Sequence, residues 1–238
     1  RLRATQDFTL APDADHIEIV TTAVMPITRS ISVGDFVLLS DDGFDPFSVG
    51  GGFDRDRIRA EESLVLIGAA GEDQHMAYGL FGEAPWAPDM SIAPLLRSLG
   101  GDDMTLYFPV TEVRFEAFVP LTFRRFVAIG RDVDDLNRAR FSALGTSDLG
   151  MLTGTVTDGS NPVAGARVHV LDPSTDPPAY MSMGRTGDDG SFSIQVEPGR
   201  YRLVATGDDI GQDVEIPVRP LPDNGQAFAH GFVRSAPV

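Results

Sequence analysis

Alternation of apolar and polar residues between Met151 and Arg219 constrains the fold of this chain more than any other feature. Residues 191–196 place Phe, Ile and Val at every second position, and residues 167–170, 201–205 and 213–218 repeat the pattern. A period of two residues puts the apolar side chains on one face of a strand. Several short strands of this kind, separated by turns, predict a sandwich or a barrel.

Two turn sequences separate these predicted strands. Asp189-Gly190 predicts a tight hairpin turn with positive φ angles, and Pro198-Gly199 predicts another turn just before Tyr201. Turn chemistry already explains the acidic residues of the first turn, so they need no metal or catalytic role. We therefore expect this region to fold as a closed set of strands.

The same region resembles the carboxypeptidase regulatory-like family of transthyretin-like Greek-key sandwiches. The resemblance rests on the sequences GTVTD at 154–158, PVAGARV at 162–168, TGDDGSFSI at 186–194 and EPGRY at 197–201. Domains of this family are appended to many larger extracellular proteins. The resemblance therefore implies an accessory domain and an extracytoplasmic location, and it names no substrate.

The length of 238 residues leaves about 150 residues before the sandwich, enough for a second domain. We predict one domain at 1–148, the sandwich at 149–219, and a tail or the start of a further segment at 220–238. Alternation at 17–19, 33–37 and 104–110, an apolar run at 64–67, and apolar residues on one face at 123, 127 and 129 predict further strands. The predicted fold class is all-β.

Two short helices are expected among these strands. Asp132 is placed to cap a helix over Val133 to Leu144, which Gly145 would end. Ser91 is placed to cap a second helix over Ile92 to Leu99, followed by two glycines.

The N-terminal region is similar to part of a galactose-mutarotase-like supersandwich. Residues 8–10, 17–22 and 33–37 resemble its later strands, and residues 121–130 with Asp132-Val133 resemble its closing strand and small helix. The available length is too short for a complete supersandwich, so the resemblance implies an incomplete N-terminal domain. A supersandwich before a regulatory-like domain is similar to the front of carbaryl-hydrolase-like bacterial metallohydrolases, whose catalytic domain comes afterwards. A comparable pair of domains occurs in some polysaccharide lyases.

Composition excludes several classes of function. The net charge of −16 disfavours binding to nucleic acid or to anionic membranes, because both need a positive surface. The chain has no cysteine, and all of its basic residues are arginine, which excludes thiolate and Schiff-base chemistry and is typical of a bacterial, GC-rich source. No apolar run reaches the ~20 residues that cross a bilayer, so we expect no membrane insertion. Because the chain begins with Arg1, we expect a piece of a larger protein.

No catalytic residues are predicted. The four histidines at 16, 75, 169 and 230 match none of the compact zinc spacings, and the sequence has no Gly-x-Ser-x-Gly motif. His75 follows two carboxylates in GEDQH and is a candidate ligand-binding residue, although such polar clusters usually form loops.

An acidic, glycine-rich stretch is the one candidate metal site. Calcium prefers six to eight oxygen ligands, which a loop of this composition can supply. The proposed ligands are Asp41, Asp42, Asp45 and Asp54. The alternative is a solvated or ion-paired loop, since arginines at 55, 57 and 59 can neutralise the same acids.

Trp86, in the sequence EAPWAP, is the second candidate ligand-binding residue. Its ring could stack on a sugar, or it could plug the end of a sandwich, because a tryptophan buries a large apolar area.

The predicted function is therefore that of a non-catalytic accessory fragment that supports or positions a neighbouring domain or protein. One alternative is the front portion of a metal-dependent hydrolase whose active site lies outside these 238 residues. The other is a carbohydrate-binding module. Apart from calcium, no cofactor is expected.

Overall fold

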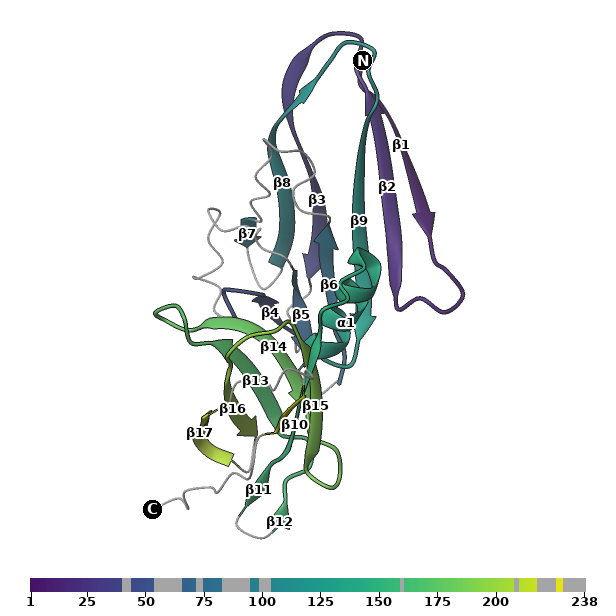
Figure 1. Ribbon diagram of the computed structural model, residues 1–238. Helices are drawn as coiled ribbons and strands as arrows, with labels where there is room; N and C mark the ends of the chain where they lie inside the picture. The colour runs from purple at the N-terminus through teal and green to yellow at the C-terminus, as the bar shows by residue number, and fades with distance from the viewer. Residues whose placement is uncertain are drawn as a thin grey trace. The chain divides into compact units, whose positions relative to one another are not determined.

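The computed structural model describes residues 1–39, 44–53, 66–71, 75–82, 95–98, 104–158, 161–207, 210–217 and 226–228. Among these residues it is nearly all β, with a single α-helix, which confirms the predicted all-β class. The chain divides into two compact units, Arg1–Arg131 and Asp132–Val238 (Figure 1). Within the described ranges no helix is long and apolar enough to cross a membrane.

The first unit contains two antiparallel sheets. The larger has the strand order β1-β2-β9-β6-β5-β4, and the smaller has the order β3-β8-β7. The strands of the larger sheet are β1 (Arg3–Thr9), β2 (His16–Val24), β4 (Phe44–Ser48), β5 (Ile67–Gly71), β6 (Ala77–Gly82) and β9 (Leu121–Gly130). Those of the smaller sheet are β3 (Arg29–Leu39), β7 (Leu95–Ser98) and β8 (Met104–Phe115). The strands predicted from residues 17–19, 33–37, 104–110 and 123–129 are all present.

The helix predicted over Ile92 to Leu99 is wrong where the structure describes it. Leu95–Ser98 form strand β7, which pairs antiparallel with β8 from Leu95 opposite Tyr107 to Ser98 opposite Met104. Residues 91–94 and 99 lie outside the described ranges. A short apolar run does not distinguish helix from strand by its period, and here the neighbouring strand provides the backbone hydrogen-bond partners.

Burial along β9 changes from one face of the strand to the other. Near its start Phe123 packs in a buried cluster with Met25. Near its end Phe126 is buried and stacks on Phe81 with ring centroids 5.2 Å apart, whereas Ile129 is 63% exposed. The apolar residues that we expected on one face of this strand therefore differ in burial, and the buried face changes along the strand.

The second unit contains a sandwich of two sheets with a hydrophobic core between them. The sheets have the orders β15-β10-β18 and β14-β13-β16-β17, and a small hairpin, β11 (Thr157–Asp158) with β12 (Asn161–Pro162), stands beside them. The sandwich strands are β10 (Gly150–Thr155), β13 (Arg167–Asp172), β14 (Ala179–Arg185), β15 (Ser191–Val196), β16 (Arg202–Gly207), β17 (Ile210–Pro217) and β18 (Gln226–Phe228). Phe192, Ile194 and Val196 from one sheet meet Val168 and Leu203 from the other in the core, as the alternation predicts.

Strand β18 extends the sandwich beyond the end that we predicted at residue 219. It pairs parallel with β10, with Leu152 opposite Ala227. The residues predicted as a tail or the start of a further segment, 220–238, thus include a strand at Gln226–Phe228. Three residues are too few to show a strand period in the sequence.

The turn between β14 and β15 differs in detail from the predicted one. Gly190 has a φ of 73°, as expected, but Asp189 does not share this conformation. The Gly190 N–H donates to the carbonyl of Gly187 at 2.9 Å, so Asp188 and Asp189 form the centre of the turn. Asp189 accepts hydrogen bonds from the N–H and the hydroxyl of Ser191 at 3.0 and 2.6 Å.

The predicted helix α1 (Val133–Leu144) is confirmed with both of its caps. The side chain of Asp132 accepts a hydrogen bond from the N–H of Asp135 at 3.1 Å. Gly145 ends the helix in the left-handed region with φ 67°, where glycine is favoured. The helix contacts β14 and β15 of the sandwich, and the compact units divide before it rather than at residue 148.

Candidate functional site

Helix α1 presents a row of buried polar side chains to the sandwich. Asp134, Asn137 and Arg140 are spaced three residues apart, which places them on one side of a helix, and all three are buried. Polar groups in such a position are costly unless they are hydrogen-bonded. Their partners therefore decide whether the helix is locked to the sheets.

Asn137 is the centre of this row and is 2% exposed. Its amide nitrogen donates to the carbonyl oxygen of Met181 at 3.0 Å and to the hydroxyl of Ser182 at 3.2 Å, both on β14. Its amide oxygen accepts a hydrogen bond from Nε of Arg140 at 3.3 Å. One side chain thus joins the helix to a strand that lies more than forty residues later in the sequence.

Asp134 makes the matching connection to β15. One carboxylate oxygen accepts the backbone N–H of Gln195 at 2.8 Å, and the other accepts Nε of Arg138 at 2.7 Å. Burial raises the pKa of Asp134 to about 6, although the hydrogen bonds from Arg138 and Gln195 and the charge of Arg138 act in the opposite direction. Desolvation of the carboxylate is therefore the dominant effect at this position.

Two arginines complete the junction. Arg138 also donates to the backbone oxygen of Ser193 on β15 at 3.1 Å. The guanidinium of Arg140 lies 4.4 Å from the ring centroid of Phe141, a cation–π distance, and 3.9 Å from a carboxylate oxygen of Glu197. Burial lowers the pKa of Arg140.

Tyr201 fixes the turn that lies next to this junction. Its hydroxyl donates to the backbone oxygen of Glu197 at 2.6 Å, and burial raises its pKa to about 12. The space between Asn137, Arg140 and Tyr201 amounts to about 10 Å³, room for no more than one water. The arrangement is therefore suited to holding the helix in place and leaves no room for a small-molecule ligand.

Three carboxylates at the start of α1 lie close enough together to contact one cation. Ligand oxygens of Asp132, Asp134 and Asp135 are within 4.8 Å of one another. Asp132 caps the helix, however, and Asp134 already accepts hydrogen bonds from Arg138 and Gln195. These contacts explain the acids as parts of the fold, since carboxylates in the first turn also favour the positive end of the helix dipole.

The structure describes two of the six residues that we predicted as ligands. Asp45 is exposed on β4, and His75 is exposed with a φ of 46°. Asp41, Asp42, Asp54 and Trp86 lie outside the described residues. The calcium site and the ligand-binding roles of His75 and Trp86 therefore remain predictions.

The polar row of α1 was not predicted from the sequence. A signal was present, because the two caps fix the helix and place residues 134, 137 and 140 on one side of it. Their burial could not be predicted, since it depends on contacts with β14 and β15. Polar residues at this spacing ordinarily mark an exposed face.

Residues 151–228, about a third of the chain, match the family model described as a carboxypeptidase regulatory-like domain. No curated protein matches the chain. This match supports the assignment of the second unit as a transthyretin-like β-sandwich, and the comparisons confirm neither the galactose-mutarotase-like nor the carbaryl-hydrolase-like resemblance.

Several solved structures are distantly similar. The major plantain pollen allergen is 17% identical with a TM-score of 0.27, over 37% of this chain and 98% of the allergen. A polysaccharide lyase is 7% identical with a TM-score of 0.39, over 90% of this chain and 33% of the lyase. The major pilin subunit of Bacillus cereus is 8% identical with a TM-score of 0.24, over 99% of this chain and 71% of the pilin. Residues 151–228 of the chain thus form a β-sandwich that resembles a carboxypeptidase regulatory-like domain.

Proposed function

We propose that this chain is a non-catalytic accessory fragment that positions a neighbouring domain or protein, with α1 as the element through which its sandwich is held. The observation that carries the proposal is the set of buried hydrogen bonds from Asn137 and Asp134 to β14 and β15. A sandwich can position a neighbour only if its attachment to the preceding chain is stiff. A helix fastened by buried polar contacts meets that requirement, because each contact is costly to break.

The small space beside the buried row also supports a non-catalytic role. It amounts to about 10 Å³ and has no room for a substrate.

We propose an extracytoplasmic location for the fragment. The support is the match of residues 151–228 to the carboxypeptidase regulatory-like family, together with the strongly acidic composition of the chain. Neither nucleic acid nor a membrane is proposed as a partner, because a net charge of −16 opposes both.

Backbone dynamics of the full chain test this role of α1. Nitrogen-15 relaxation should give the amides of α1 order parameters as high as those of β15 in the wild-type protein. Asn137→Ala should lower the order parameters of α1, while Ser142→Ala, on an exposed position of the same helix, should leave them unchanged. Order parameters of α1 well below those of β15 in the wild-type protein would contradict the proposal.

A further inference from the structure

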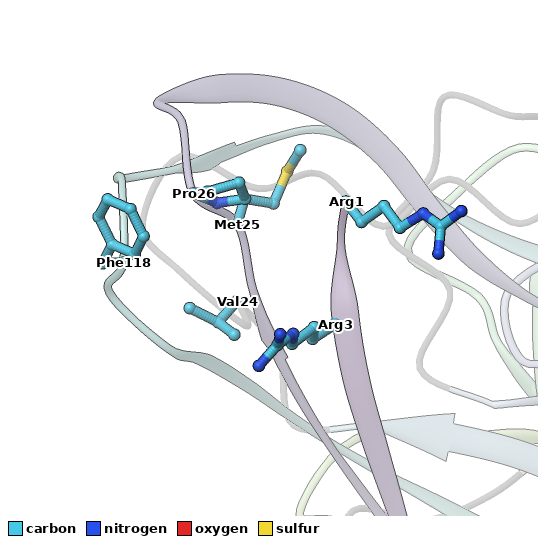
Figure 2. Close-up of a pocket in the computed structure, with 6 residues that line it drawn as sticks. All are labelled: Arg1, Arg3, Val24, Met25, Pro26 and Phe118. Atoms are coloured by element: carbon cyan, nitrogen blue, oxygen red, sulfur yellow. The ribbon is translucent and has the colours of Figure 1, made fainter.

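A cavity of about 310 Å³ opens beside the start of β1 and the end of β2 in the first unit. It is lined by Arg1, Arg3, Val24, Met25, Pro26 and Phe118. Figure 2 shows Phe118 on one side and the two arginines on the other, with Val24, Met25 and Pro26 between them; the side chain of Arg3 extends toward Val24, whereas that of Arg1 extends away from Phe118. The lining thus has a cationic side and an aromatic side.

The two arginines have no acidic partner among the residues that the structure describes. None of the ion pairs in those ranges includes Arg1 or Arg3, whereas nearby Arg114 pairs with Glu116 at 2.8 Å. The chain as a whole carries a net charge of −16. In so acidic a protein, the guanidinium of Arg3 at this cavity, which has no acidic partner among the described residues, favours an anion as the occupant.

Phe118 is held in a conformation that a bulky residue rarely adopts. Its φ is 62°, and the residue is 74% exposed. Its N–H donates to the carbonyl of Met25 at 2.7 Å, and the neighbouring Ala117 forms an isolated bridge with Met25. Strain of this kind clusters at ligand sites, where the surrounding contacts maintain it.

Size and lining together indicate the class of ligand. The cavity is at the lower end of the range for small-molecule sites, which combine apolar walls with a few placed polar groups. Since a water molecule takes up about 30 Å³ in the liquid, the cavity has room for about ten groups of that size. Guanidinium groups bind carboxylates through paired charged hydrogen bonds, and an aromatic ring suits an apolar body.

We infer that this cavity binds a small organic carboxylate with an apolar or aromatic body, the carboxylate lying at Arg3 and the body against Met25 and Phe118. For a ligand of this size a dissociation constant on the order of 1 mM is expected. The inference is independent of the proposed positioning role, because every residue of the cavity belongs to the first unit.

Titration of the full chain with 3-phenylpropionate, followed by amide chemical shifts, tests the inference. We expect saturable shifts confined to residues around Val24, Met25 and Phe118. The neutral 3-phenylpropanamide should bind at least fivefold more weakly, because it lacks the negative charge. Inorganic phosphate should also bind at least fivefold more weakly, because it lacks the apolar body. High salt should lower the affinity for 3-phenylpropionate, because it screens the charge of the guanidinium group.

Three variants separate the roles of charge and ring. Arg3→Gln should lower the affinity for 3-phenylpropionate at least fivefold. Arg200→Gln, which removes the same charge from an exposed position of the second unit, should leave that affinity unchanged. Phe118→Gly should weaken binding at least threefold while keeping the fold, because glycine accepts the left-handed conformation without strain.

Four outcomes would overturn the inference. They are the absence of saturable binding, equal affinity for the amide, equal affinity for phosphate, and an affinity unchanged by both Arg3→Gln and Phe118→Gly. A wild-type amide spectrum for each variant shows that its fold is intact, so a loss of binding then reports on the cavity itself.

Discussion

Replacement of Asn137 by alanine tests how strongly α1 is held to the sandwich. The substitution removes hydrogen bonds of 3.0 Å to Met181, 3.2 Å to Ser182 and 3.3 Å from Arg140 in a site that is 2% exposed. Each buried hydrogen bond contributes about 1 kcal/mol net, and alanine returns at most about 0.7 kcal/mol through its higher helix propensity. We therefore expect the free energy of unfolding of the second unit to fall by about 2–3 kcal/mol.

Urea unfolding of the full chain, followed by the amide signals of β15, measures this change in the second unit alone. Ser142→Ala is the matched control, because position 142 is exposed on the same helix, and it should change the free energy by less than about 0.5 kcal/mol. A loss below about 0.5 kcal/mol for Asn137→Ala would refute the reasoning, since the three hydrogen bonds would then contribute nothing measurable.

Three further predictions concern the turn, the buried carboxyl group and calcium. A Cβ at Gly190 would lie 2.5 Å from the carbonyl oxygen of Val156, whereas one at Gly165, with a similar φ of 70°, meets nothing within 4 Å. Gly190→Ala should therefore lower the melting temperature more than Gly165→Ala, and equal effects would contradict the predicted clash. Because folding raises the pKa of Asp134 from about 4 to about 6, its stabilising effect is complete below pH ~4 and is lost as the pH rises through ~6. The wild-type protein should lose roughly 3 kcal/mol relative to Asp134→Asn over that window, and parallel pH profiles in urea unfolding would exclude this. If the acidic stretch at 41–54 binds calcium, calcium at about a hundred times its dissociation constant should add about 2.7 kcal/mol of stability, and an unchanged melt would identify a solvated loop.

The sandwich could be predicted from the sequence because its strands have one buried face. Phe192, Ile194 and Val196 alternate with polar residues and are all buried, so the period of two translates directly into burial. Helix α1 could also be predicted from the sequence, because Asp132 and Gly145 are capping residues that mark its two ends. Both features depend on residues close together in the sequence.

The remaining features depend on contacts between distant residues. Leu95–Ser98 form a strand because β8 lies beside them, and β18 joins the sandwich through β10. The cavity brings Arg3 to Phe118 across more than a hundred positions of sequence. No local period, cap or turn signal carries such information, and tertiary pairing overrides weak local preferences.

Hydrogen exchange of the native full chain measures whether α1 opens together with the sandwich. If Asn137 and Asp134 lock the helix to β14 and β15, the amides of α1 and β15 should open with the same free energy. Asn137→Ala should then lower the opening free energy of the α1 amides more than that of the β15 amides. Exchange of the α1 amides in the wild-type protein at free energies several kcal/mol below those of β15 would contradict the claim, because the helix would then open while the sandwich stays folded.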